Sequence, residues 1–340
     1  MTNAALNGRT GDSRRERPPG PGLIEACGWT LFYMFAQAIA AVACIVVLVV
    51  AAFNGWPADK EAPLRLLLDV NLDTSFLLIG VTTLGALFIL MPAVRLRFGK
   101  QMRARLQLRR PDKRNLLLAV GAVVPLAVLS RALYELALQQ WNQLAADIPA
   151  LADLQQANTL EAVANQSASV PFLILVVALA LGRALRAEII FRGVIGPGLV
   201  RRWGVLLGVL ITSVLFAGVH GFPPHAVATL PLACFLHYAL LRTGSLWTPI
   251  VLHFLNNALA LAMIKYPLLG RLPDSPSVLF ASALYIVVVA ALLGTTWEPV
   301  QQLSLWNWRR AFRSSWVDAL AAGCIAGFTT AFVWSVMNGG

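Results

Sequence analysis

The chain has 340 residues, of which 58% are hydrophobic and only 13% are charged. Soluble domains carry about a quarter charged residues, so a water-soluble surface is excluded, as are a disordered chain and a disulfide scaffold. The net charge of +11 does not indicate nucleic-acid binding, because the cytoplasmic loops of membrane proteins collect Lys and Arg. The composition therefore predicts an all-α polytopic membrane protein.

Apolar runs of about the 20 residues that a bilayer requires follow a polar, basic tail. They predict about nine transmembrane helices, with eight as the alternative count, at 27–53, 74–94, 115–131, 169–200, 203–220, 224–241, 245–264, 277–296 and 316–337. The chain then divides into four parts: a flexible basic cytoplasmic tail (1–26), N-terminal membrane helices and loops (27–168), a core with polar residues inside its helices (169–265), and C-terminal membrane helices (266–340).

The charges of the loops predict the orientation. Segment 95–114 holds nine Lys or Arg against one acid, whereas segment 131–168 holds one base against four acids. The positive-inside rule places the first in the cytoplasm and the second outside. We expect an integral protein of a prokaryotic plasma membrane, with a cytoplasmic N-terminus and, for nine helices, an external C-terminus.

Ionisable and polar residues interrupt the predicted helices four, five and seven. Such residues are costly at membrane depth, so each is taken as a candidate functional residue. Glu188 and Arg192 are four residues apart, so they share a helix face and can pair. His253 and Asn257 are likewise one turn apart on one face. Counted from the cytoplasmic turns, these residues and His220 fall near the middle of the membrane, which predicts that they converge.

The residue types in this group indicate amide hydrolysis. A carboxylate with an imidazole can activate water, and a second imidazole with an amide can stabilise an oxyanion. The alternative is a zinc ion held by Glu188, His220 and His253, although the HExxH spacing typical of such sites is missing. Two other histidines stand apart: His225 is predicted at the surface and His237 as a satisfied packing residue.

At these residues the sequence resembles the CPBP family, which comprises CAAX proteases and bacteriocin-processing intramembrane proteins. The family carries the motifs EExxxR, FxxxH and HxxxN/D on separate membrane helices. The likeness covers about 170–265. The matching residues are Glu188 with Arg192, Phe216 with His220, and His253 with Asn257.

One position departs from the family pattern, because the first glutamate of EExxxR falls on Ala187. The resemblance implies that this position carries the water-activating carboxylate, that Arg192 holds the second glutamate, and that His253 and Asn257 stabilise the oxyanion. A methyl group transfers no proton, so Glu188 would have to serve, although it is rotated by about 100° on the helix. Three explanations stay open: a turned or distorted helix, an inactive enzyme, or a residue changed deliberately to trap an inactive form.

The sequence thus predicts a glutamate-type intramembrane endopeptidase that cleaves a membrane-associated protein or peptide without a cofactor. Its predicted catalytic residues are Glu188, His220, His253 and Asn257, with Arg192, Phe216 and the position of Ala187 in support. The expected partners are the substrate and the lipid bilayer, and not nucleic acid. The alternative is a catalytically silent membrane scaffold or binding protein. A transporter is disfavoured, because no paired Gly- or Pro-broken helices occur in two matching halves.

Overall fold

The computed structural model describes residues 20–69, 72–148, 170–266 and 275–295, together with the single positions 151 and 269. Within these ranges every regular element is helical. Most of the predicted tail and the predicted ninth helix at 316–337 lie outside the described residues. The elements are α1 (Leu23–Phe53), α2 (Ala62–Asp69), α3 (Leu72–Phe98), η1 (Gly99–Gln101), α4 (Met102–Arg105), α5 (Lys113–Gly121), α6 (Val123–Asp147), α9 (Phe172–Leu175), η3 (Val176–Leu181), α10 (Gly182–Ala187), η4 (Glu188–Ile195), α11 (Gly196–Gly218), α12 (Pro223–Thr243), α13 (Trp247–Lys265) and α15 (Pro276–Thr295).

Six helices among the described residues are long and apolar enough to cross a membrane. They are Leu23–Phe53, Phe76–Arg105, Lys113–Asp147, Pro223–Thr243, Trp247–Lys265 and Pro276–Leu293. The prediction of an all-α polytopic membrane protein is therefore confirmed. The predicted fourth and fifth segments are also helical, but they are not among these six.

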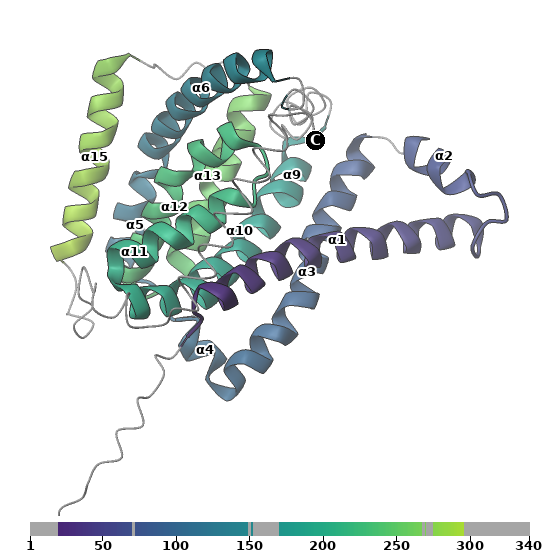
Figure 1. Ribbon diagram of the computed structural model, residues 1–340, viewed down its shortest axis with the longest axis horizontal. Coiled ribbons are helices and arrows are strands. Elements are labelled where there is room, and N and C mark those ends of the chain that lie inside the picture. Colours follow the sequence, from purple (N-terminus) through teal and green to yellow (C-terminus); the bar gives the residue numbers. More distant parts are fainter. Residues whose placement is uncertain are drawn as a thin grey trace, which may run out of the picture.

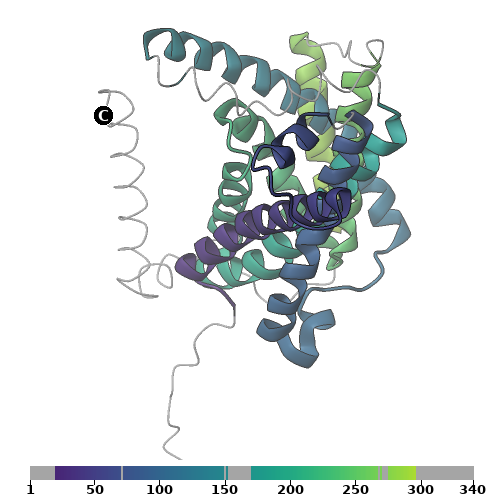
Figure 2. The same cartoon turned by 90° about the vertical axis from the view of Figure 1, so that its right-hand side faces the viewer.

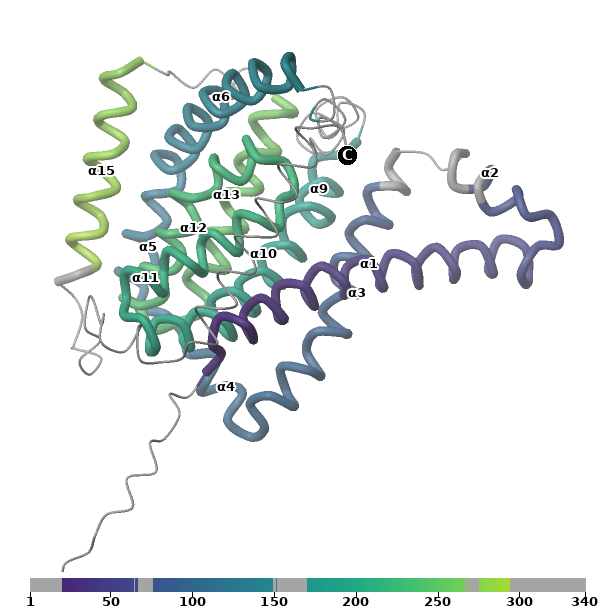
Figure 3. The backbone as a smooth tube through the Cα atoms, in the orientation of Figure 1, coloured from purple at the N-terminus to yellow at the C-terminus, as the bar shows by residue number. Residues whose placement is uncertain are grey.

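The helices form a bundle from which one hairpin extends (Figure 1). Helix α12 packs against α6, α11, α13 and α15, and the core segment α10 packs against α3 and α13. Helices α1 and α3 pack against each other, and in Figure 3 the chain leaves the bundle along α1 and returns along α3 to α4. Large apolar side chains on these outer helices are exposed, such as Phe88 on α3 and Phe280 on α15. Such surfaces suit lipid rather than water.

The basic segments that the sequence places in the cytoplasm lie at one end of the bundle. Arg97 donates to Glu25 at the start of α1, with 2.7 Å between Nε and Oε1. Arg109 donates to the main-chain oxygens of Gly244 and Thr243 at the end of α12, over 2.6 and 2.9 Å. Three segments far apart in the chain, namely the start of α1, segment 95–114 and the end of α12, are thereby joined. The orientation of this end in a membrane stays a prediction.

Two predicted helix boundaries are wrong. The third helix was expected to end near 131, but α6 continues to Asp147 and extends sideways at the upper end of the bundle in Figure 2. Residues 132–147 mix Ala and Leu with polar residues such as Gln, and these are good helix formers, so the lower hydrophobicity does not end the helix. The turn between the fourth and fifth segments lies at Gly204 (φ +83°), whereas the sequence placed it at 201–202. Glycine adopts this backbone conformation without steric cost.

Candidate active site

Glu188 is fully buried and holds two partners on one carboxylate oxygen. Its Oε1 accepts from Nη1 of Arg192 at 3.0 Å and lies 2.7 Å from Nδ1 of His253. This oxygen acts as an acceptor toward the arginine. In its second contact it also accepts, so Nδ1 of His253 is the donor. Glu188 therefore fixes the orientation and the tautomer of His253, which comes from another helix, α13.

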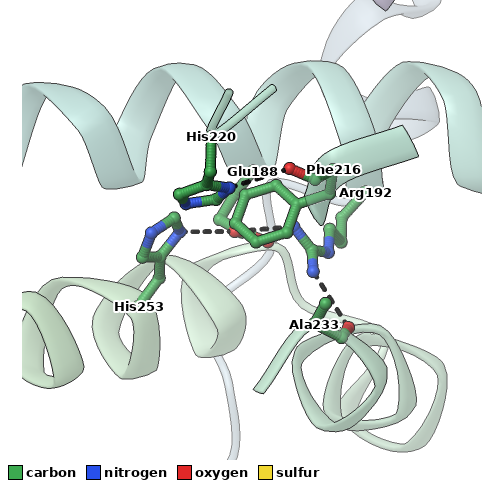
Figure 4. Close-up of polar contacts among 6 residues, drawn as sticks. All are labelled: Glu188, Arg192, Phe216, His220, Ala233 and His253. Carbon is green, nitrogen blue, oxygen red and sulfur yellow. Dashed lines mark hydrogen bonds and ion pairs between the residues drawn. The ribbon is translucent and has the colours of Figure 1, made fainter. Parts of the chain in front are cut away.

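Arg192 joins three elements from a position without solvent exposure. Besides its bond to Glu188, it donates through Nη2 to the main-chain oxygen of Ala233 on α12, at 2.9 Å. Its guanidinium also lies over the ring of Phe216, 4.3 Å from the centroid. Figure 4 shows this arrangement, with Arg192 between Phe216 and Ala233. A planar group with several donors is suited to such a junction.

His220 follows α11 in a short turn. Its Nδ1 lies 3.1 Å from the main-chain oxygen of Phe216 and 3.2 Å from that of Ala217. Carbonyl oxygens only accept, so Nδ1 carries the proton and Nε2 of the neutral ring is an acceptor. In the part of the chain that the structure describes, no hydrogen bond reaches this Nε2.

Phe216 packs against both histidines. Its ring centroid is 5.2 Å from that of His220 and 5.4 Å from that of His253, and both pairs meet edge to face. In Figure 4 the two imidazoles lie next to each other, with Glu188 behind the Phe216 ring. The three predicted motifs thus meet in space: the structure brings Glu188 and Arg192 together with Phe216, His220 and His253.

Two predicted positions lie beside this group rather than within it. Asn257 follows His253 by one turn of α13 and is half-buried, and it makes no hydrogen bond with the described residues of the group. Ala187 is 2% exposed and belongs to an apolar cluster that includes Phe191 and Phe216. The helix is distorted at this point, because α-helical hydrogen bonding gives way to the wider π form from Glu188 to Ile195. Such π segments are rare and frequent at functional sites.

His225 is a neighbour that the sequence analysis missed. It was expected at the surface, but its ring centroid lies 4.7 Å from that of His220 and its side chain is half-buried. Gly221 with positive φ, followed by prolines that open α12, turns the chain back over His220. His237 is buried as expected, but neither of its ring nitrogens has a hydrogen-bond partner among the described residues, so it is not a satisfied packing residue.

Metal ligation has little support in the described donor set. No three His, Cys, Asp or Glu side chains lie together there as a metal ion requires. In the alternative zinc set, Oε1 of Glu188 is already used by Arg192 and His253, and the Nδ1 atoms of both histidines are donors.

Residues 169–259, about a quarter of the chain, match the family model described as type II CAAX prenyl endopeptidase Rce1-like. Over these residues the chain is similar to this family. The Rce1-like segment includes all three motifs, and the resemblance inferred from them is confirmed. Together with the six apolar helices, the match supports an integral membrane protein whose core is similar to a protease. No curated protein and no solved structure matches the chain.

Proposed function

We propose that the protein is an intramembrane endopeptidase that hydrolyses a peptide bond of a membrane-anchored protein or peptide, near the substrate's terminus. One observation carries the proposal: within the Rce1-like segment, the Glu188–His253 hydrogen bond lies beside the acceptor nitrogen of His220. Two neighbouring imidazoles, each held at Nδ1 by protein oxygens, can act on the attacking water and on the carbonyl oxygen of one peptide bond.

His220 is the general base in this proposal. Its Nδ1 proton is held by two carbonyl oxygens, so Nε2 is left to accept a proton from water. His253 is the second group: its Nδ1–H is held by Glu188, and in the doubly protonated ring Nε2–H donates to the oxyanion. Asn257, one turn later on α13, supplies a second donor.

The reaction proceeds in two steps through a tetrahedral intermediate. The water oxygen forms a bond with the carbonyl carbon while its proton passes to Nε2 of His220, and the carbonyl oxygen becomes the oxyanion. The intermediate then collapses, the carbon–nitrogen bond breaks, and His220 returns the proton to the amine that leaves. No cofactor takes part.

Glu188 acts as a positioning residue in this scheme. Its Oε1 is used by Arg192 and His253, and the whole side chain is buried, so it reaches the substrate only through His253. The water-activating carboxylate that the resemblance implies at position 187 is replaced here by His220 alone. We expect a slower enzyme than one with both groups.

Cleavage of a quenched fluorescent peptide by the purified full-length protein in detergent tests the proposal. His220→Ala and His253→Ala should each lower kcat/KM by about 10²–10⁴-fold, the usual contribution of acid–base groups. His237→Ala is the matched control, because this histidine is buried in the same bundle but contacts neither His220 nor His253 through any described hydrogen bond. Equal activity in all three variants would disprove the mechanism.

A second candidate function is a catalytically silent scaffold that binds membrane peptides. Ala187 favours it, since the apolar methyl packs into the core where the resemblance implies a carboxylate. In that case the purified protein binds the peptide but never cleaves it, and the histidine variants change neither outcome.

A further inference from the structure

The turn that follows α3 carries a group of exposed cations. Residues 95–111 hold seven Lys or Arg and no acidic residue. Two of the seven are used inside the protein: Arg97 pairs with Glu25, and Arg109 donates to main-chain oxygens of the α12–α13 turn. Four of the others, at the end of α3 and on η1 and α4, are exposed and form no ion pair with a described residue. We call them the α4 surface: Arg95, Lys100, Arg103 and Arg105.

The α4 surface is held in place by the core of the bundle. Leu106, directly after α4, is 1% exposed and lies in the apolar cluster that contains Ala187. It packs so closely against the motif helix that a Cβ on Gly193 would lie 2.6 Å from its Cδ2. One residue later, the main-chain oxygen of Gln107 accepts from the N–H of Leu246 at 3.0 Å. The cations therefore project from a fixed turn, and binding a ligand there costs little backbone entropy.

This surface lies where a helix long enough to cross a membrane ends. Helix α3 belongs to the candidate span Phe76–Arg105, and the turn with α4 lies at the lower end of the bundle in both Figure 1 and Figure 2. Leu96, between two arginines, is 86% exposed. An exposed leucine suits acyl chains, whereas Lys and Arg suit the headgroup layer above them. The combination favours a lipid surface over an acidic protein or a nucleic acid, which would leave the leucine in water.

We propose that the α4 surface binds the phosphate groups of anionic phospholipids in the adjoining leaflet. A guanidinium takes a phosphate through two parallel hydrogen bonds, and the ammonium of Lys100 adds a point charge. The four cations repel one another, and an anion among them lowers that repulsion. The positive-inside rule places segment 95–114 at the cytoplasmic leaflet, which carries the negative surface potential.

Native mass spectrometry of the purified full-length protein in neutral detergent tests this inference, with titrations of phosphatidylglycerol and of phosphatidylcholine. The double variant Lys100→Gln with Arg103→Gln should bind phosphatidylglycerol about 10- to 30-fold more weakly, since each Lys or Arg near an anionic surface contributes about a fivefold factor. The parent should prefer phosphatidylglycerol over phosphatidylcholine by at least this factor. Binding of the neutral lipid should not change.

A control pair and a second test pair accompany this variant. Lys60→Gln with Arg65→Gln also removes one Lys and one Arg from exposed positions, but at the other end of the α1–α3 pair, so it should leave the preference unchanged. Arg95→Gln with Arg105→Gln changes the same surface at two other residues and should weaken binding by a similar factor. Either test pair therefore decides the question if the other fails to fold.

Equal retention of the two lipids by the parent overturns the inference, and so does an unchanged affinity for phosphatidylglycerol in the test pairs. An equal loss in the control pair also overturns it, because binding would then follow the total charge of the protein. If inorganic phosphate at the lipid concentration displaces phosphatidylglycerol from the parent, the site takes the free ion and the lipid assignment is wrong. None of these measurements requires turnover, so their outcome is independent of the proposed hydrolysis.

Discussion

At the scale of single residues, Glu188 uses only one of its two carboxylate oxygens as a hydrogen-bond acceptor within the described part of the chain. Its Oε2 is buried without a hydrogen bond from the described residues, whereas Oε1 serves two donors. An unsatisfied buried acceptor costs about 1–3 kcal/mol. A buried water molecule that reached Oε2 would recover this free energy, and Glu188 would still act on the substrate only through His253.

Ala187→Glu should raise the rate of peptide cleavage. General-base catalysis contributes about 10²–10⁴-fold, and a methyl group contributes none. The measurement is kcat/KM with the quenched peptide. Ala187→Gln introduces a side chain of nearly the same size as glutamate but without the carboxylate, so this variant should show no gain in rate.

The gain should also depend on His220, because the new carboxylate and this imidazole would act on one water. His220→Ala in the Ala187→Glu background should return the rate to the level of His220→Ala alone. A folded Ala187→Glu protein that cleaves no faster than the parent would contradict this prediction.

Arg192→Ala should destabilise the protein strongly. Removing one partner of a buried ion pair leaves an uncompensated charge and costs about 3–5 kcal/mol. Arg192→Lys should rescue poorly, because a single ammonium cannot reproduce the contacts with Glu188 and Ala233 together. The thermal midpoint in detergent measures the effect.

A half-exposed ion pair on the same protein provides the control. Arg97→Ala removes the partner of Glu25 at the surface, where such pairs are worth about 0–1 kcal/mol. If Arg192→Ala melted at the same temperature as Arg97→Ala, the Glu188–Arg192 pair would not contribute to stability.

Removal of metal should leave the activity unchanged. The proposed mechanism uses only imidazole, carboxylate and amide groups, and the donor nitrogens of both histidines point to protein oxygens. Incubation with a chelator followed by the cleavage assay tests this expectation. Stoichiometric zinc in elemental analysis, with activity lost on its removal and regained on its return, would require a metal mechanism.

At the scale of elements, the turn between α12 and α13 depends on a glycine for two reasons. Gly244 has a φ of +58°, and a Cβ at this position would lie 2.0 Å from Nη2 of Arg109. Gly244→Ala should therefore lower stability by more than the roughly 1–2 kcal/mol of a left-handed residue. The measurement is the thermal midpoint of the purified protein.

Gly99→Ala is the matched control for this change. Gly99 has nearly the same φ, +55°, but nothing lies within 4 Å of its Cβ position. It should show the backbone cost without the clash. Equal melting of the two variants would mean that Arg109 moves aside freely and does not hold the α12–α13 turn.

The elements also show what the sequence could and could not predict. Apolar periodicity and length located α1, α3, α12, α13 and α15, because lipid requires long apolar helices. The switch to π hydrogen bonding at Glu188 was not predictable, since it has no signature in composition or spacing. The extension of α6 was missed because hydrophobicity marks where a membrane ends and not where a helix ends.

For the site, the motif residues could be found because each is an uncommon polar residue in an apolar helix. Their contacts across helices could not be assigned from spacing alone. Spacing indicated that Glu188 and Arg192 pair, but not that His253 binds the same oxygen. The contact of His225 with His220 depends on a turn whose direction only the folded chain reveals.

At the scale of the whole molecule, labelling of single cysteines should test the predicted orientation. Lys60 and Lys100 are both exposed and lie at opposite ends of the α1–α3 pair. A membrane-impermeant thiol reagent should label Lys100→Cys in inside-out vesicles and Lys60→Cys in right-side-out vesicles, since the basic segment 95–114 belongs in the cytoplasm. The native cysteines are replaced beforehand. The reverse pattern would invert the orientation.

Phe216 has a consequence for how the site can change over generations. One ring contacts His220, His253 and Arg192 at once. Substitutions at residues in contact are not independent, and their interaction free energies reach about 0.5–3 kcal/mol. A replacement at 216 would alter the effect of every later replacement at the other three positions. Lineages that altered this ring first would find different changes permissible at the histidines from lineages that kept it, so the order of mutation shapes which variants of this chain can arise.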